Sequence, residues 1–481
     1  MKHWAEHGRA FEYLVDNGLH ETPLGPARRK IHYEPVGVVG ALTPWNVPFY
    51  LNVAETVPAL MAGNTVVLKP AQLTPWSGSE YGRIVAEETD IPAGVFNVVV
   101  SNANEAGAAL SADPRIDMIT FTGSTATGRA ILAAGASTVK KTLLELGGKS
   151  AHVVLDDADF NSALPMAAMM ACVMSGQSCI LPSRILLPRS RYDEGLAILK
   201  GAMENFPVGD PWTPGNMQGP QISETQRQKV LGLIKSGIDS GARLVTGGGV
   251  PENLPTGYYV QPTLLADVDP DSQVAKEEIF GPVLTVTAYD TDDDAVAIAN
   301  NTIYGLSGEV SSADVDRAFE VAKRMRTGNV TINGRSHFGI GSPFGGTKQS
   351  GLGYRNGEEG YKESSRPRRS GCPIDGRGRH DAYIDYSPAG AATGSPTTNW
   401  SAHRMGGAVV TSARRTCGSS TRRPALRNHI CDSARVASDN IGTCRRRMPP
   451  FDDGGQTPTA GDGTALRADA VSVATRTHDR R

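Results

Sequence analysis

The stretch MITFTGSTATGRAILAAGA, residues 118–136, contains a short apolar run, a Gly-Ser turn and a helix-forming run, in that order. This order is typical of a strand followed by a helix. Gly123 and Ser124 stand where the helix begins, and free backbone N–H groups at such a point can bind a phosphate. The spacing from Gly123 to Gly128 matches neither G-x-G-x-x-G nor a Walker sequence. An ordinary N-cap at Ser124 explains the turn equally well.

The same alternation extends along the chain in both directions. Short apolar runs alternate with helix-forming stretches from residue 36 to 147, and again from 148 to about Asn333. Such alternation indicates βαβ units, so we predict an α/β fold with mainly parallel sheets. The strands predicted in the first region are PVGVVGAL (35–42), TVVLKP (65–70), VFNVVV (95–100), MITFTG (118–123) and KKTLLELG (140–147).

Charge is distributed unevenly along the 481 residues. Residues 364–481 contain 19 Arg and 10 Asp but no Lys or Glu, a net charge of +9. The first 363 residues hold the other 29 basic and 40 acidic residues, a net charge of −11. Because large apolar residues are scarce after residue 363, we predict a low-complexity, disordered tail there. Its composition resembles GC-rich coding DNA translated out of frame, a hypothesis that the other reading frames of the gene would test.

The arginines of this tail also raise the alternative of a basic arm for nucleic acid. We do not expect a nucleic-acid partner, because the arginines are scattered among Asp residues and no interleaved aromatic residues are present to stack on bases. The N-terminus has no apolar secretory segment, and no run of 18 apolar residues predicts a membrane span. Two cysteines in the first 363 residues fit a reducing compartment, so we expect a cytoplasmic protein. No cysteine spacing predicts a metal site.

Three further segments contain polar side chains suited to catalysis. TPWNVP (43–48) holds Asn46 between prolines, where its amide either points at a fixed place or forms an Asx turn. ELGGKS (145–150) begins with Glu145, either an exposed charge at a strand end or a base that activates water. EEIFGPV (277–283) is either a solvated Glu pair before a buried Phe or part of a binding site.

The stretch ACVMSGQSCI (171–180) contains Cys172 and Cys179, and the next cysteine of the chain is Cys372. A free Cys commonly packs as a small hydrophobic residue, so packing is the default interpretation of both. The surrounding motifs have to decide whether either cysteine is a nucleophile.

Together these segments resemble the NAD(P)-dependent aldehyde dehydrogenase superfamily. The resemblance covers about residues 10–363 and rests on eight motifs in the family's order. They are TPWNVP, LKPAQLTP, FTGSTATG, LLELGGKS, GQSC, EEIFGPV, GNVTING and PFGGTKQSGLG. Glu145 follows Asn46 by 99 residues and Cys179 follows Glu145 by 34, as the family places them.

The resemblance implies an aldehyde dehydrogenase-like fold, with a Rossmann-type cofactor domain and an α/β catalytic domain. The cofactor-binding domain would span residues 1–147, with a bridging hairpin at about 24–36, and the catalytic domain would span 148–335. The Gly-rich segment 336–363 would return to the cofactor domain. Residues 364–481 would remain as the disordered tail.

The implied reaction is the oxidation of an aldehyde to a carboxylic acid with NAD or NADP, through a cysteine thiohemiacetal and a thioester that water hydrolyses. Cys179 would be the nucleophile and Glu145 the general base, while Asn46 and the Cys179 N–H would form the oxyanion hole. Cys172 would only pack. We expect the site to lower the pKa of the nucleophilic thiol, whose reference value is about 8.5. The implied cofactor-binding residues are Trp45, Lys69, Gln72, Gly123, Ser124, Glu278 and Phe280.

Gln72 departs from many NAD-preferring relatives, which have Glu three residues after the lysine that here is Lys69. A carboxylate there accepts from the ribose 2′-OH and repels a 2′-phosphate. Neutral Gln72 therefore predicts weakened discrimination between NAD and NADP.

Both ends also depart from the family. Relatives usually begin well before the first helix of this chain, and SSRPRRSGCP (364–373) stands where a bridging strand is expected. Pro and clustered Arg make a poor strand, so we expect the strand to be absent and homo-oligomer assembly to be doubtful. Two alternatives therefore accompany the dehydrogenase. One is a catalytically impaired, truncated or frameshifted remnant, and the other is a basic-tailed interaction protein.

The aldehyde substrate is not specified by these motifs. Phe49, Tyr50, Met170 and Phe338 suggest an apolar lining for a substrate tunnel. Glu145 favours hydrolysis by water over transfer of the acyl group to coenzyme A.

Overall fold

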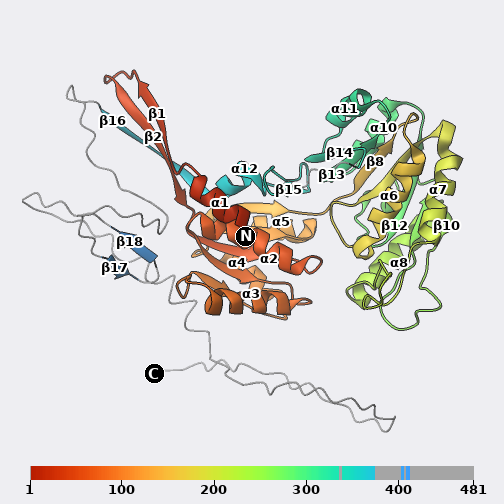
Figure 1. Ribbon diagram of the computed structural model, residues 1–481, viewed down its shortest axis with the longest axis horizontal. Coiled ribbons are helices and arrows are strands. Elements are labelled where there is room, and N and C mark those ends of the chain that lie inside the picture. The colour runs from red at the N-terminus through yellow and green to blue at the C-terminus, as the bar shows by residue number, and fades with distance from the viewer. Residues whose placement is uncertain (1, 335–338, 374–401, 406–407, 412–481) are drawn as a thin grey trace, which may run out of the picture. The chain divides into compact units, whose positions relative to one another are not determined.

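A computed structural model describes residues 2–334, 339–373, 402–405 and 408–411 (Figure 1). All of these belong to one unit, Met1–Ser438. The second unit, Asp439–Arg481, lies outside the described residues. Among the described helices, none is long and apolar enough to cross a membrane.

Residues 38–145, together with a short strand at 351–352, form a six-stranded sheet in the order β15-β7-β6-β3-β4-β5. Its strands are β3 (Val38–Leu42), β4 (Thr65–Lys69), β5 (Phe96–Val98), β6 (Met118–Thr122), β7 (Lys141–Glu145) and β15 (Gly351–Leu352). The helices between them are α2 (Pro48–Met61), α3 (Pro75–Glu88), α4 (Glu105–Ala112) and α5 (Thr125–Gly135), with a 3-10 turn at Ala136–Thr138 (η1). All neighbours pair in parallel except β15 with β7. The predicted strand–helix alternation of this region is confirmed.

The second region forms a seven-stranded sheet in the order β10-β11-β12-β9-β8-β13-β14. Its strands are β8 (Ser150–Val154), β9 (Pro182–Pro188), β10 (Arg243–Thr246), β11 (Thr263–Ala266), β12 (Val283–Tyr289), β13 (Ser307–Ser311) and β14 (Asn329–Ile332). The helices are α6 (Phe160–Cys172), η2 (Val173–Gly176), η3 (Arg189–Arg191), α7 (Tyr192–Glu204), α8 (Glu224–Asp239), α9 (Gln273–Lys276), α10 (Asp292–Asn300) and α11 (Val315–Arg324). Only the β10–β11 pair is antiparallel.

Each sheet is held by its own apolar clusters. Val39, Leu68 and Met118 pack under the first sheet, together with Tyr81 of α3. Cys172 lies at the end of α6 in the cluster under the second sheet, where it is completely buried among apolar side chains. The interpretation of Cys172 as a packing residue is therefore confirmed.

A third sheet has the order β1-β2-β16 and stands at one end of the first sheet (Figure 1). It consists of β1 (Leu14–His20), β2 (Ala27–Pro35) and β16 (Ser365–Pro373). The hairpin therefore begins at Leu14 rather than near residue 24. Helix α1 (Lys2–Ala10) and helix α12 (Gly357–Glu363) meet close to this sheet, where Trp4 stacks on Tyr361 at a ring-centroid distance of 5.9 Å.

Strand β16 corrects the expectation that SSRPRRSGCP forms no strand. It pairs with β2 without interruption, from Ser365 opposite Pro35 to Pro373 opposite Ala27. As the edge strand of this sheet, β16 can accommodate proline, because one of its sides needs no N–H donor. The doubt about assembly that rested on a missing strand no longer holds. Two short strands, β17 (Ala402–Met405) and β18 (Ala408–Thr411), pair further along the predicted tail, and the rest of that tail lies outside the described residues.

Candidate active site

The carboxyl edge of the first sheet gathers residues that are far apart in the sequence. Asn46 follows β3, Lys69 ends β4, Gly123 follows β6 and Glu145 ends β7. Because these four strands are parallel neighbours, their carboxyl ends lie along one edge of the sheet. In open α/β sheets this edge is where ligands bind.

The nucleophile candidate lies on a loop and not within α6, which ends at Cys172. Met174 and Ser175 adopt left-handed backbone conformations, so the chain turns sharply before Cys179. Gly176 also has a positive φ of 70°, and a Cβ on it would lie 2.1 Å from the backbone of Gly281. Only glycine therefore lets this loop pack against the EEIFGPV turn.

Two hydrogen bonds attach this loop to the segment that precedes α8. The Gln221 side chain donates to the Ser175 carbonyl at 2.9 Å, and the Ile222 N–H donates to the Gln177 side chain at 2.9 Å. A loop that is tied at several points can hold a nucleophile in a fixed position. The sequence motifs did not reveal this support, because Gln221 stands far from the loop in the sequence and belongs to none of the motifs.

Contacts between the two regions bring Cys179 to the edge of the first sheet. The Asn46 amide donates to the Gln177 carbonyl at 2.9 Å, two residues before Cys179. A Cβ on Gly148 would lie 2.3 Å from the Cys179 carbonyl oxygen, so the GGKS turn passes directly beside the nucleophile. An amide nitrogen has two hydrogens, so Asn46 keeps one for the oxygen of a bound aldehyde.

Glu145 is buried, with 3 % of its surface exposed. Neither of its carboxylate oxygens has a hydrogen-bond partner among the described residues. Burial raises the pKa of Glu145 to about 8, Arg355 opposes that rise and Glu55 adds to it. A carboxyl group with a pKa near the working pH can accept a proton and release it again, as a general base must.

The Cys179 thiol differs from what the sequence predicted. Burial raises its pKa to about 12, and the negative charges of Glu278 and Glu145 act in the same direction. The expectation that this site lowers the thiol pKa is therefore wrong. A thiol of this kind needs a base to take its proton, and Glu278 and Glu145 are the carboxylates whose charges act on it.

The residues expected to bind the cofactor fit a dinucleotide. Ser124 caps α5 and accepts from the Thr127 N–H at 3.2 Å, and no acidic residue lies in the first turn of this helix. The Gly123 N–H donates to the Glu145 carbonyl at 3.0 Å, which links the glycine turn to the carboxyl end of β7. A helix N-terminus without acidic side chains is suited to a pyrophosphate.

Lys69 lies at the end of β4, where burial lowers the pKa of its ammonium group, and Gln72 is exposed in the loop before α3. The Glu278 carboxylate accepts from the Gly148 N–H at 3.0 Å. The Phe280 ring meets the Trp45 ring edge to face, with centroids 5.4 Å apart. The structure thus places Glu278 and Phe280, from the second region, beside residues of the first sheet.

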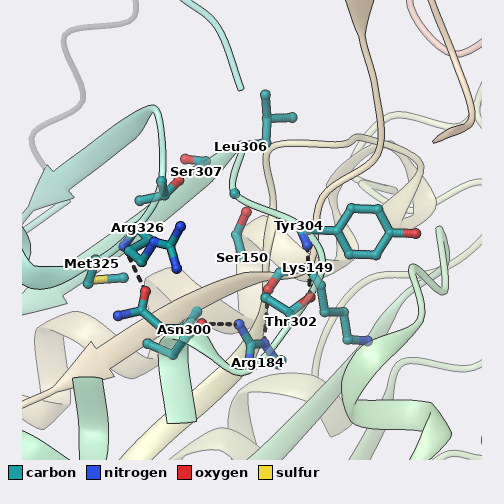
Figure 2. Close-up of a pocket in the computed structure, with 14 residues that line it drawn as sticks. Lys149, Ser150, Arg184, Asn300, Thr302, Tyr304, Leu306, Ser307, Met325 and Arg326 are labelled. Atoms are coloured by element: carbon teal, nitrogen blue, oxygen red, sulfur yellow. Dashed lines mark hydrogen bonds between the residues drawn. The ribbon is translucent and has the colours of Figure 1, made fainter. Parts of the chain in front are cut away.

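A separate cavity is lined by Lys149 and Arg184, together with residues of the segment 299–307 (Figure 2). Arg184 donates to the carbonyls of Lys149, Ile298 and Ala299 at 2.8–2.9 Å, so its guanidinium is used in holding the backbone. None of the predicted catalytic residues lines this cavity. It belongs to the packing between β8, β13 and the end of α10.

A larger cavity of about 280 Å³ opens beside Ile180, which directly follows Cys179. Asn329 and Val330 of β14 line it, as do Pro343 and Phe344 of the Gly-rich segment. The residues predicted to line a substrate tunnel are not among the described residues that line this cavity. Phe49 and Tyr50 are exposed, Met170 is half-buried, and Phe338 lies outside the described residues.

Two charged residues near Glu145 were not singled out by the motifs. Glu55 of α2 and Arg355, in the loop before α12, form a buried ion pair. Glu55 is 4 % exposed and Arg355 is 9 % exposed. The Glu55 position within an apolar helix was a signal in the sequence, since a buried carboxylate normally requires a partner.

Comparison with known proteins assigns the chain to a family. The sequence profile described as the aldehyde dehydrogenase family matches residues 9–369. The chain is 44 % identical over 344 residues to 3-succinoylsemialdehyde-pyridine dehydrogenase of Pseudomonas sp.. The matched residues make up 71 % of this chain and 71 % of that protein. It is 42 % identical to human aldehyde dehydrogenase 1A1 over 69 % of this chain and 66 % of the relative.

Solved structures agree with this assignment. An aldehyde dehydrogenase of Mycobacterium tuberculosis in complex with NAD+ is 44 % identical, with a TM-score of 0.73 over 76 % of this chain and 74 % of that chain. A mutant of aldehyde dehydrogenase C of Pseudomonas syringae, in complex with NAD+ and octanal, is 41 % identical with a TM-score of 0.71, over 75 % of this chain and 72 % of that chain. The chain spans about two thirds of the length of several curated relatives.

The fold and site thus define an oxidoreductase of the NAD(P)-dependent aldehyde dehydrogenase class. The chain belongs to the aldehyde dehydrogenase family.

Proposed function

We propose that this chain oxidises an aldehyde to a carboxylic acid with NAD or NADP as the hydride acceptor. The observation that supports the proposal is the convergence of Asn46, Glu145 and Cys179 from two separate regions of the fold. The Asn46 amide donates to the carbonyl of Gln177, two residues before Cys179, and the charge of Glu145 raises the pKa of the Cys179 thiol.

In the first step Glu145 takes the Cys179 proton and the thiolate sulfur adds to the aldehyde carbon. The new alkoxide oxygen accepts hydrogen bonds from the Asn46 amide and the Cys179 N–H. Collapse of this thiohemiacetal returns the oxygen to a carbonyl and releases hydride from carbon, which leaves a thioester on Cys179. Bound NAD(P)+ supplies the electrophile for that hydride.

Glu145 then releases to solvent the proton that it took from Cys179. In the second step a water molecule adds to the thioester carbon while Glu145, again a carboxylate, accepts a proton from it. The sulfur leaves as thiolate, and the carboxylic acid gives its remaining proton to solvent and departs as a carboxylate. Glu145 is suited to this role because it is buried near Cys179 and its pKa of about 8 lets it both take up and release a proton near neutral pH.

For the cofactor, the N-terminus of α5 would hold the pyrophosphate and Lys69 the adenosine ribose. Glu278 would hold the nicotinamide ribose beside Phe280 and Trp45. Gln72 is exposed and neutral, so nothing at this position repels a 2′-phosphate. We therefore expect the Kd values for NAD and NADP to differ by less than about a hundredfold.

The test is formation of NADH or NADPH, followed by its absorbance, with a panel of aldehydes that includes octanal and a short semialdehyde. Cys179→Ala is the control that removes the nucleophile. Thermal unfolding with and without cofactor separates the catalytically impaired alternative from the active enzyme, because a ligand of the native state raises the midpoint. The proposal would be contradicted if neither cofactor raised the thermal unfolding midpoint and the chain oxidised none of the aldehydes.

A further inference from the structure

A buried ion pair lies at the carboxyl edge of the first sheet, and the steps above do not use it. Arg355 contacts the Glu55 carboxylate and the Thr122 hydroxyl. The hydroxyls of Thr120 and Thr122, on β6, both donate to the same carboxylate, the latter at 2.6 Å. Glu55 is thus held by three donors, and it in turn fixes the guanidinium of Arg355.

The register of the sheet places this pair beside Glu145. Thr122 of β6 lies opposite Glu145 of β7, and facing residues of parallel neighbours point to the same side of the sheet. The Thr122 hydroxyl that contacts Arg355 is therefore on the Glu145 side. The Nε of Arg355 and both Glu145 oxygens are buried atoms that lack hydrogen-bond partners among the described residues.

The ionisation of Glu145 is coupled to three neighbouring groups, which are Arg355, Glu55 and Cys179. Arg355 lowers the pKa of Glu145, Glu55 raises it, and the pKa of Cys179 is itself raised by the charge of Glu145. Arg355 acts on both members of the catalytic pair, since it also lowers the pKa of the Cys179 thiol. A buried carboxylate without such a cation would stay protonated and could not accept a proton from water.

We propose that Arg355 is a positioning residue for thioester hydrolysis, which keeps Glu145 available as a carboxylate, and that Glu55 limits how much of the Arg355 charge reaches Glu145. The inference rests on the proposed function, because it assigns Glu145 the role of base. Removal of a purely structural ion pair would change the stability of the fold and leave the ionisation of Glu145 unchanged. Removal of a charge from this pair should change the ionisation of Glu145.

The experiment uses p-nitrophenyl acetate, which acylates a thiol without any cofactor. The thiolate adds to the ester carbonyl and p-nitrophenolate leaves as a burst, which forms an acetyl thioester. Water then adds, its proton passes to Glu145, the thiolate leaves and acetate is released. The burst reports the nucleophile, and the steady-state rate against pH reports the base.

The variant that decides the question is Glu55→Gln, which keeps the shape of the side chain and its acceptor oxygen. With the negative charge gone, the full charge of Arg355 acts on Glu145, so the rise of the hydrolysis rate should move to lower pH by about one unit or more. Arg355→Met should move it to higher pH by a similar amount, and Arg355→Lys, which keeps the charge, should restore most of the wild-type profile. Glu145→Gln should lose the pH-dependent rise itself.

Thermal unfolding of each variant accompanies the profiles, because removal of Arg355 leaves a buried carboxylate without its cation. The double variant Glu55→Gln/Arg355→Met removes both charges and provides a folded comparison if the single Arg355 variant is unstable. A hydrolysis profile of Glu55→Gln that stays in place, or moves to higher pH, would overturn the inference. A wild-type chain without a burst would instead contradict the proposed function, because the wild-type chain holds both Arg355 and Glu55 and should form the thioester.

Discussion

At the scale of single residues, two cysteines seven positions apart have different surroundings. Cys172 is completely buried in an apolar cluster, whereas Cys179 lies on the loop beside Asn46 and Glu145. We expect Cys179→Ala to abolish the acylation burst without loss of stability. We expect Cys172→Ala to keep the burst and to lower the free energy of unfolding by about 1 kcal/mol. Burst amplitude and chemical denaturation of both variants check this, and equal loss of the burst in the two would contradict the assignment.

The raised pKa of Glu145 also predicts how the free energy of unfolding depends on pH. Its pKa is 4.5 in the unfolded reference state and about 8 in the folded protein, so the folded state binds more protons between these values. The contribution of Glu145 to stability is therefore greatest below pH 4.5 and is lost as the pH rises toward 8. Compared with Glu145→Gln, the wild-type protein should lose stability progressively across this window. Unfolding in denaturant from about pH 5 to about pH 8.5 measures the difference, and a constant difference would show that Glu145 does not titrate in this range.

At the scale of the elements, the bend between α6 and Cys179 depends on Gly176. Its φ of 70° and its close approach to the Gly281 backbone leave no room for a side chain. We expect Gly176→Ala to cost about 1–3 kcal/mol and to slow acylation of Cys179. Gly201→Ala in α7 is the matched control, because a Cβ there meets no atom within 4 Å. That variant should stabilise the protein by about 0.5–1 kcal/mol and leave the burst rate unchanged.

The same elements show what sequence patterns can predict. The strands and helices from β3 to β7 follow from local apolar runs with Gly and Pro at their ends, so their order and approximate limits were predictable. Strand β16 was not, because its pairing depends on the free edge of β2, which lies near the start of the chain. The same applies to Arg355, whose partner Glu55 belongs to a helix of the first sheet and stands far from it in the sequence. Motifs proposed Asn46, Glu145 and Cys179 as site residues, and long-range packing alone revealed the charges around them.

At the scale of the whole Met1–Ser438 unit, the site joins two sheets. Gly123 and Ser124 belong to the first region and Glu278 to the second, and the edge-to-face contact of the Trp45 and Phe280 rings connects the two regions. A dinucleotide held at both ends should therefore protect backbone amides in both regions from hydrogen exchange. At a cofactor concentration of about 100 Kd the native state gains about 2.7 kcal/mol. Exchange measured by mass spectrometry should slow in peptides that cover 123–128 and 277–283, and Cys179→Ala should behave like the wild type because the thiol does not hold the cofactor. Protection confined to 123–128 would mean that the nicotinamide end is not bound beside Phe280 and that hydride transfer lacks its geometry.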